Sequence, residues 1–329
     1  MFDMIGFGES MLRLTPFRFE RIEQARAFDV SIGGAELNVA ACLSRLGLKT
    51  SYVTRLARNP IGRLIEARAH EIGVDTSHVI WSNEDRQGVY YLEFGALPRA
   101  NAIIYDRKGT AVSKIQPGML DWDKILSQTK ALHVTGITPA LSSSAAEVTT
   151  EALKKAKEKK VQVSFDLNYR VQLWTQEEAK KTLSSLMPYV DILITTEEDT
   201  ERVFQIKGKD WEDVAGKLVD AFGFRIVAIT LRENVTVWRN NWTAIALKDG
   251  KIYKDRKYEI EVVDRVGSGD AFAGGFLYGY LTRGDVQEAL KYGNATAVLK
   301  HSNPTDFGWF TLEEVEKLIV GGGDLRINR

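Results

Sequence analysis

Segments with strand character and segments with helix character alternate along most of this sequence, and this alternation constrains the fold more than any other feature. Short runs rich in β-branched residues, such as 131–137, 161–168 and 190–196, are separated by segments with apolar residues at helical spacing, such as 142–160 and 175–187. Crossovers of this kind join parallel strands and are nearly always right-handed. The sequence therefore predicts an α/β protein with a mostly parallel central sheet and helices on both of its faces. The same patterns predict further helices at 33–47, 60–73, 197–206 and 210–223, and further strands at 49–57 and 225–231.

Two parts of the chain, at about 9–32 and 87–113, interrupt this alternation. Both contain strand-like runs without intervening helices, and the run 88–95 has apolar residues on both strand faces. Such a sheet must be covered, so we expect a small β lid that lies over a cleft, makes a dimer contact, or does both. No repeat, low-complexity tract or Pro/Ser-rich linker is present, which predicts a single domain over residues 1–329.

Charge and composition exclude several classes of protein. Lys and Arg together number 44, as do Asp and Glu, so no net charge attracts a nucleic acid or an anionic membrane. No secretory signal and no run of eighteen apolar residues is visible. The single cysteine, Cys42, cannot form an internal disulfide and fits a small buried residue. We expect a soluble, cytoplasmic protein.

The stretch 262–281, VVDRVGSGDAFAGGFLYGYL, is the strongest candidate for a functional motif. An alternating strand-like run at 258–263 precedes Gly267-Ser268-Gly269, and a helical pattern follows until Gly284. The first amides of a helix are unpaired and carry partial positive charge, so a phosphate is a natural ligand there. Asp270 is either a helix-capping acid or a general base beside this anion site. No P-loop occurs, and GFGES at 6–10 is too incomplete for a dinucleotide-binding fingerprint.

Two separated motifs give this chain its resemblance to the ribokinase-type (PfkB-family) carbohydrate kinases. One is DRVGSGDAF at 264–272, with Ser268 where the family usually has Ala, and the other is GGAELNVA at 33–40. The resemblance extends over nearly the whole chain and implies a ribokinase-like fold with ATP and Mg²⁺ as cofactors. It also implies that Asp270 is the catalytic base and that Gly267, Ser268 and Gly269 form the anion hole. Gly33 and Gly34 would present bare backbone to the sugar, and Asn38 would hydrogen-bond it.

Arginines distinguish between possible sugars. Tyr105 and Arg107 are two residues apart on one strand face, and Arg170 follows the end of a core strand, where α/β sheets bind ligands. Guanidinium groups match a carboxylate better than a neutral sugar. The combination resembles the 2-keto-3-deoxygluconate kinases, which implies transfer to the C6 hydroxyl of that small acidic sugar. At matching positions, Tyr90 and Asp306 would contact the sugar.

The sequence departs from the family pattern in the region expected to bind nucleotide. The Asn-x-x-Glu motif that organises magnesium is replaced by TEED at 196–199, so no residue is assigned to the metal. The loop expected at 232–238, RENVTVW, has no glycine. Ser268, Gly269, Arg232, Asn168 and Asn294 are the predicted nucleotide contacts.

Two alternatives to the acidic-sugar kinase remain. One is a kinase for ribose, fructose or a nucleoside, and the other is a non-catalytic sugar-binding protein on the same fold. We also expect a homo-oligomer formed through the β lid.

Overall fold

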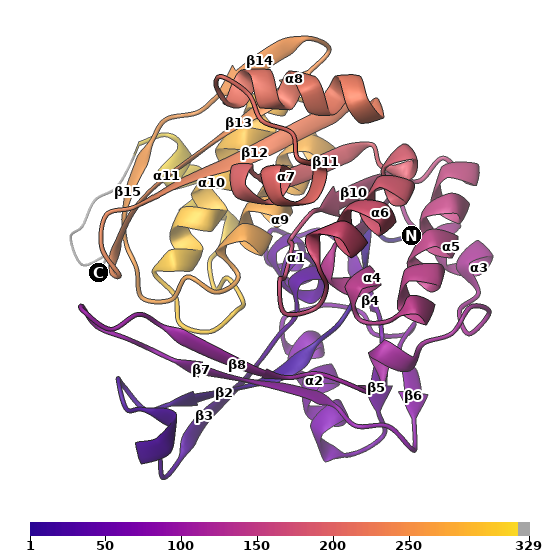
Figure 1. Cartoon of the computed structure of the whole chain (residues 1–329), viewed down its shortest axis with the longest axis vertical. Helices are drawn as coiled ribbons and strands as arrows, with labels where there is room; N and C mark the ends of the chain where they lie inside the picture. The colour runs from indigo at the N-terminus through magenta and orange to yellow at the C-terminus, as the bar shows by residue number, and fades with distance from the viewer. Residues whose placement is uncertain (322–329) are drawn as a thin grey trace.

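A large, mostly parallel sheet forms the centre of the computed structural model, which describes residues 1–321 (Figure 1). The strand order is β14-β13-β12-β11-β10-β9-β1-β4, and β15 also pairs with β13. Every pairing from β12 to β4 is parallel, whereas β13 runs antiparallel to its neighbours, which confirms the predicted sheet. The strands are β1 (Met4–Phe7), β4 (Thr50–Val53), β9 (Ala131–Thr135), β10 (Gln162–Asp166), β11 (Ile192–Thr196), β12 (Ile226–Asn234), β13 (Arg239–Lys248), β14 (Lys251–Lys254) and β15 (Tyr258–Glu261).

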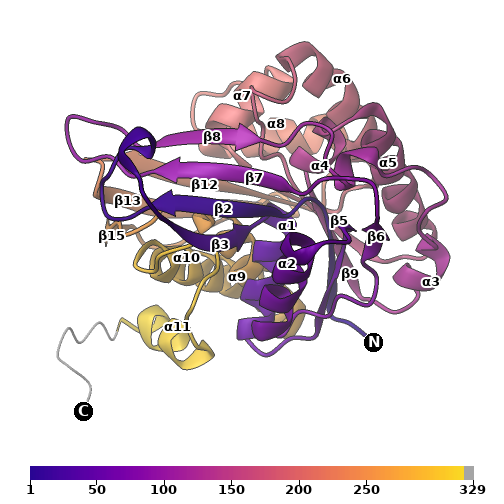
Figure 2. The same ribbon diagram turned by 90° about the horizontal axis from the view of Figure 1, so that it is seen from below.

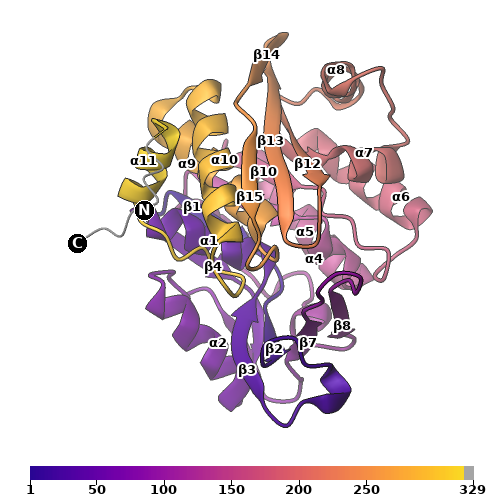
Figure 3. The same cartoon turned by 90° about the vertical axis from the view of Figure 1, so that its left-hand side faces the viewer.

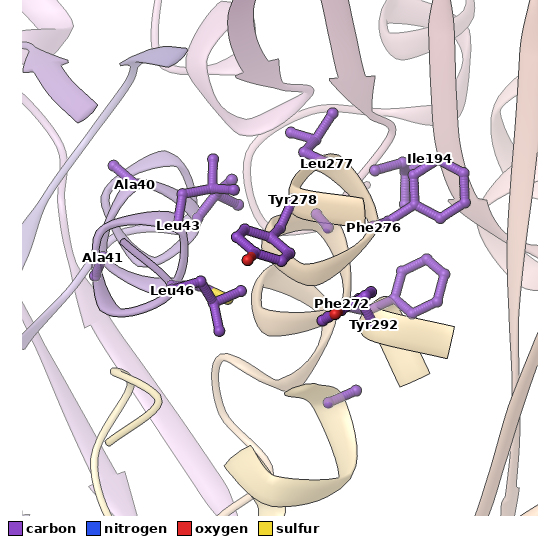
Figure 4. Packing of buried hydrophobic residues seen from close by; sticks show 14 of the residues in the cluster. Ala40, Ala41, Leu43, Leu46, Ile194, Phe272, Phe276, Leu277, Tyr278 and Tyr292 are labelled. Carbon is purple, nitrogen blue, oxygen red and sulfur yellow. The ribbon is translucent and has the colours of Figure 1, made fainter. Parts of the chain in front are cut away.

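Helices cover both faces of this sheet, as Figure 3 shows from the side. The buried residues form one apolar core with α1, α9 and α10 on one face and a second core with α5, α6 and α8 on the other. Figure 4 shows part of the first core, where Phe272 and Phe276 pack toward the sheet. The helices are α1 (Ala35–Arg45), α2 (Pro60–Glu71), α3 (Trp122–Leu126), α4 (Ile137–Ala140), α5 (Ser143–Glu158), α6 (Gln176–Leu186), α7 (Glu197–Phe204), α8 (Trp211–Phe222), α9 (Ser268–Arg283), α10 (Val286–His301) and α11 (Leu312–Ile319).

The second sheet that the sequence predicts is present and lies to one side of the main sheet (Figure 1), and Figure 2 shows its strands face-on. Its order is β3-β2-β7-β8, and we call these four strands the lid sheet. The end of the predicted lid segment 87–113 is not a strand, because the chain turns after Asp106 and forms a short 3₁₀ helix at Val112–Lys114. The lid strands are β2 (Met11–Pro16), β3 (Phe28–Gly33), β7 (Gly88–Glu93) and β8 (Ala102–Asp106).

Two other predicted segments differ in the structure. The single strand expected at 49–57 is two strands, because the chain leaves the main sheet at Thr54 and β5 (Arg55–Ala57) pairs with β6 (Ile80–Ser82) instead. The loop expected at 232–238 is a hairpin, because β12 continues through Asn234 in register with β13. Long antiparallel pairing there replaces the expected loop.

Glycines inside α9 allow close packing against its neighbours. A Cβ on Gly275 would lie 2.1 Å from the Thr296 hydroxyl of α10, and one on Gly274 would lie 2.7 Å from the sulfur of the buried Cys42. Helix α9 is therefore wedged between α1 and α10, and its N-terminus is held in a fixed position. Within residues 1–321, no helix is both long and apolar enough to cross a membrane.

Candidate active site

A cleft of about 1000 Å³ lies between the lid sheet and the carboxyl ends of the parallel strands β10, β11 and β12. This is the edge of an α/β sheet at which ligands bind. All but one of the predicted site residues line this cleft. They are Gly33, Gly34, Asn38, Tyr90, Tyr105, Arg107, Asn168, Arg170, Arg232, Gly267, Ser268, Gly269, Asp270 and Asp306.

The predicted anion-binding turn is the N-terminus of α9. Gly267 precedes the helix with a φ of 84°, a left-handed conformation that favours glycine. A Cβ on this residue would also lie only 2.2 Å from the main-chain oxygen of Asp306. The turn therefore needs glycine for two reasons, and it directs the first amides of a sixteen-residue helix at the cleft.

Asp270 lies in the first turn of α9 with 9% of its surface exposed. Its Oδ2 accepts a hydrogen bond of 2.6 Å from Nδ2 of Asn38 on α1. Burial raises the pKa of Asp270 to about 6, although the bond from Asn38 and the charge of Arg170 oppose this change. A carboxylate with that pKa is mostly ionised at neutral pH and is basic enough to accept a proton from a hydroxyl.

Asn38 contacts the candidate base directly, which the sequence did not predict. Its side chain is 4% exposed, and its Oδ1 has no hydrogen-bond partner in the part of the chain that the structure describes. Since a buried acceptor is costly when unpaired, this oxygen is suited to accept a hydrogen bond from a ligand hydroxyl. One amide can thus both orient the base and bind a ligand.

A buried arginine that sequence reasoning missed joins the lid sheet to the cleft floor. Arg13 of β2 is 2% exposed and donates to Asp264 at 2.6 Å and to Asp306 at 2.8 Å. Tyr90 of β7 donates to the same Asp306 carboxylate at 2.6 Å. Alternation in β2 gives no signal for it, because five of the six residues are buried; the available signal was a charged residue within a mostly apolar strand.

Bare backbone at Gly33 faces this group, and contact of Gly33 and Gly34 with the sugar stays a prediction. A Cβ there would lie 2.0 Å from Oδ2 of Asp306 and 2.9 Å from the hydroxyl of Tyr90. Any larger residue at Gly33 would therefore displace the Asp306 carboxylate. Gly34 is equally restricted, because its Cβ would lie 2.2 Å from the main-chain oxygen of Glu9.

Arg107 lines the cleft but already has a carboxylate partner. Its Nε donates to Oε2 of Glu9 at 2.9 Å, and its Nη2 contacts the same oxygen. Glu9 is 2% exposed, and its second oxygen accepts from Thr110. The guanidinium also lies over the ring of Tyr105, 5.1 Å from its centre. Glu9, which was not predicted, therefore fixes the orientation of Arg107. The bonds to Glu9 use Nε and Nη2 of Arg107 but not its Nη1.

Arg170 lies among acidic residues at the other part of the cleft. Burial raises the pKa of Asp270, Asp166 and Asp199, and the charge of Arg170 opposes this rise in each. For Asp166, at the end of β10, burial and the neighbouring carboxylates outweigh this effect and hold the pKa well above its usual value. Three carboxylates share one guanidinium here, so this region favours a further cation.

These carboxylates fit a hydrated Mg²⁺ ion better than a directly coordinated one. Within residues 1–321 no group of three or more His, Cys, Asp or Glu residues is arranged to hold a metal. Mg²⁺ retains several waters and commonly takes only one or two carboxylates together with substrate phosphates. Asp166 and Asp199 are the residues that would hold its water shell.

The predicted nucleotide contacts separate into two groups. Asn168 and Arg232 line the cleft together with Ser268 and Gly269. Asn294 does not line it, because this residue is fully buried in α10. Its amide accepts from Nε1 of Trp242 at 3.0 Å and donates to Asp255 at 2.9 Å. The prediction for Asn294 is wrong in this structure, since packing between α10 and β13 uses the whole side chain.

Comparison with known proteins agrees with this geometry. The model of the pfkB family carbohydrate kinases matches residues 1–305. The 2-dehydro-3-deoxygalactonokinase of Haloferax volcanii is 38% identical over 99% of this chain and 99% of its own. A 5-dehydro-2-deoxygluconokinase of Bacillus licheniformis is 29% identical over 97% of this chain and 96% of its own. The crystal structure of 2-dehydro-3-deoxygluconokinase from Thermotoga maritima superposes with a TM-score of 0.95, at 41% identity, covering 97% of this chain and 98% of that one. The chain therefore belongs to the PfkB family of carbohydrate kinases.

Proposed function

We propose that this protein transfers the γ-phosphoryl group of ATP to the C6 hydroxyl of 2-keto-3-deoxygluconate, also called 2-dehydro-3-deoxygluconate. One observation carries the proposal: a carboxylate whose pKa is raised to about 6 lies in the first turn of α9, beside the amides of Gly267, Ser268 and Gly269. A base beside an anion-binding turn is what phosphoryl transfer to a hydroxyl requires.

In this reaction the Asp270 carboxylate accepts the proton of the C6 hydroxyl while that oxygen forms its bond to the γ-phosphorus. The bond between the γ-phosphorus and the bridging oxygen breaks, and ADP leaves with the electron pair. The helix amides stabilise the negative charge on the transferring group. Bound Mg²⁺ would supply charge neutralisation of the phosphates. Asn38 orients the base and accepts from a substrate hydroxyl.

The arginines and tyrosines of the cleft support an acidic substrate. Arg107 is fixed by Glu9 and stacked on Tyr105, so it presents its remaining nitrogen to the cleft without losing side-chain freedom on binding. Arg170 supplies the second guanidinium. The relatives named for 2-dehydro-3-deoxy sugar acids support the same class of substrate.

A second candidate is 2-keto-3-deoxygalactonate, which the full-length similarity to the Haloferax volcanii kinase favours. The discriminating measurement is kcat/KM, read as ADP formation, over a panel of the gluconate and galactonate forms, 5-keto-2-deoxygluconate, gluconate, ribose and fructose. We expect the highest value for ketodeoxygluconate. If a neutral sugar gave the highest kcat/KM, the assignment to sugar acids would be overturned. If the galactonate form gave the highest kcat/KM, ketodeoxygalactonate would be the substrate instead of ketodeoxygluconate.

We call Arg107 and Arg170, which we propose bind the carboxylate of the substrate, the carboxylate clamp, and substitution of these arginines tests it. Replacing Arg170 with Ala should raise KM for the acid by about 30-fold to 160-fold, since a hydrogen bond to a charged group is worth about 2–3 kcal/mol when buried. Replacing Arg107 alone would leave Glu9 buried without a counterion, so the Glu9→Gln, Arg107→Gln double variant is the better test. The exposed Arg68 of α2 provides the control, as Arg68→Ala. Unchanged KM in both cleft variants would refute the clamp.

We also propose that the outer face of the lid sheet contacts a second copy of the chain. Cross-strand neighbours Val30, Leu14, Tyr91 and Ile104 form one apolar row over all four strands, and Val30 and Ile104 are 50% and 55% exposed. Such a row can pair with its own symmetry copy. Light scattering should give a dimer or larger assembly that Ile104→Lys dissociates, and a monomeric parent protein would refute this contact.

A further inference from the structure

Lys300 of α10 is a buried cation that the proposed reaction does not use. Its side chain is fully buried, and its Nζ donates to two main-chain carbonyls, those of Asp264 and Asn303, each at 3.2 Å. Burial lowers the pKa of Lys300, while the charges of Asp264 and Asp306 raise it. A buried ammonium is costly to the folded state, so its presence requires a reason beyond packing.

The two carbonyls belong to the two loops beneath the anion-binding turn. Asp264 begins the loop 264–267, which ends at the helix N-terminus of α9. Asn303 begins the loop 303–306, and the main-chain oxygen of Asp306 packs against Gly267. The Lys300 ammonium therefore bridges the loop that forms the turn and the loop that supports it.

The end of α10 is attached to the same loop through its backbone. The carbonyl of His301 accepts from the amides of Val263 at 2.8 Å and Asp264 at 3.2 Å. The last turn of a helix carries partial negative charge, which favours a cation such as Lys300 at this position. Two positive groups, Arg13 and Lys300, thus face the two carboxylates Asp264 and Asp306 behind the turn.

We infer that Lys300 is a positioning residue for phosphoryl transfer, whose ammonium holds the loops 264–267 and 303–306 together and so fixes the amides of the anion-binding turn. The inference rests on the proposed transfer at this turn but not on the identity of the sugar. Lys300 does not line the cleft; besides holding the loops, its charge opposes the rise in the pKa of Asp270. Displacing a catalytic group by about 1 Å is enough to lower a rate by about 100-fold.

The first test is Lys300→Met, which keeps an unbranched side chain of similar length and removes the charge. We expect kcat to fall by about 100-fold and KM for the sugar to change much less, because Asp306 is the one predicted sugar contact in loop 303–306 and its carboxylate stays bonded to Arg13 and Tyr90. Lys291→Met is the matched control, since Lys291 lies on the same helix but is 37% exposed and pairs with Glu288. It should keep parental kcat. Parental kcat in folded Lys300→Met would overturn the inference.

Chemical rescue separates positioning from simple stabilisation. Lys300→Ala leaves a space beside the two carbonyl oxygens of Asp264 and Asn303, into which a small cation fits. We expect ammonium or methylammonium to restore at least about a tenth of the parental kcat, whereas the bulky tetramethylammonium should not. If the small and the bulky cations restored kcat equally, or if no cation restored it, the role assigned to the Lys300 ammonium would be overturned.

Folding of the variants is checked by circular dichroism and thermal unfolding. If Lys300→Met does not fold, Lys300→Gln, which keeps one donor for the carbonyls, takes its place in the same comparison. Failure of all Lys300 variants to fold, without recovery in ammonium, would assign Lys300 to stability alone and overturn the inference. A parent protein without kinase activity on any sugar of the panel would instead refute the proposed function.

Discussion

Replacing Asn38 with Leu should move the pH dependence of catalysis upward, because this change removes a hydrogen bond that favours the ionised form of the base. In the parent protein, Nδ2 of Asn38 donates to Oδ2 of Asp270 at 2.6 Å. The pKa of Asp270 is about 6 with this bond in place. The base must be ionised to accept a proton, so activity rises as pH increases through that pKa and is lost below it.

The size of the change follows from the energy of the bond. A hydrogen bond to a charged group is worth about 1.5–3 kcal/mol, and about 1.4 kcal/mol corresponds to a pKa change of one. Without Asn38 the pKa of Asp270 should therefore rise by about 1 to 2, to between about 7 and 8. At pH 7 the variant would have at most about half of its base ionised, whereas the parent has most of it ionised.

The measurement is kcat/KM for the sugar against pH at saturating MgATP, in parent and variant. Loss of the sugar contact of Asn38 lowers the whole curve but does not move its midpoint, so the midpoint reports the base. Asn294→Leu makes the same change at another buried asparagine, whose partners are Trp242 and Asp255, and its midpoint should stay at the parental value. If the midpoint of Asn38→Leu does not rise, the assignment of Asp270 as the base tuned by Asn38 is refuted.

Three further changes test other parts of the site. Arg13→Met should lower the free energy of unfolding by about 3–5 kcal/mol in urea titrations, because it removes the guanidinium that pairs with both buried carboxylates, Asp264 and Asp306; a loss below about 1 kcal/mol would contradict this. Gly33→Ala should raise KM for the sugar while leaving the far-UV circular dichroism unchanged, because its Cβ would lie 2.0 Å from Oδ2 of Asp306; a parental KM would show that this oxygen moves freely. Asp270→Asn should reduce kcat by about 10²-fold to 10⁴-fold. The same variant should gain up to about 3 kcal/mol of stability relative to the parent as pH rises from 3.8 to about 6, the unfolded and folded pKa values of Asp270, because the ionised form is destabilising in the folded state. A pH-independent difference between the two proteins would count against the raised pKa.

Sequence patterns determine the fold class well here because they report local conformation. The alternation of strand and helix patterns predicted a parallel sheet, and the two segments without helices, 9–32 and 87–113, predicted a second sheet. The glycines before α9 required a helix N-terminus open to a ligand, and Gly267 shows a positive φ there. Each of these conclusions depends on residues that are close together in the chain.

The prediction was weakest where residues distant in the chain share one charge. Arg13 and Asp264 are 251 residues apart, and Arg107 and Glu9 are 98 apart, so no local pattern pairs them. Arg107 was correctly placed in the cleft, but its partner Glu9 could not be identified before the lid sheet and β1 were positioned. Asn294 shows the opposite failure, since its position in the chain matched a nucleotide contact while the packing of α10 on β13 used its amide. Local periodicity contains no information about which buried polar groups form hydrogen bonds or ion pairs with one another.

A metal ion bound in the cleft would affect the ionisation of the base Asp270 as well as the charge of the phosphates. Burial alone would raise the pKa of Asp270 further, and Arg170 together with Asn38 limits this rise. A triphosphate placed at the turn of α9 adds negative charge beside Asp270, which opposes ionisation of the base. The positive charge of Arg170 cannot offset this added negative charge alone, because it also acts on Asp166 and Asp199. Asp166 and Asp199 would hold a divalent cation here, whose charge would favour the ionised form of Asp270 when the nucleotide is bound. The requirement for Mg²⁺ should therefore become stricter as pH falls toward 6, and this would be seen as a rising half-saturating concentration of Mg²⁺ in parent enzyme. A requirement that did not change with pH would indicate that the metal acts on the phosphates alone.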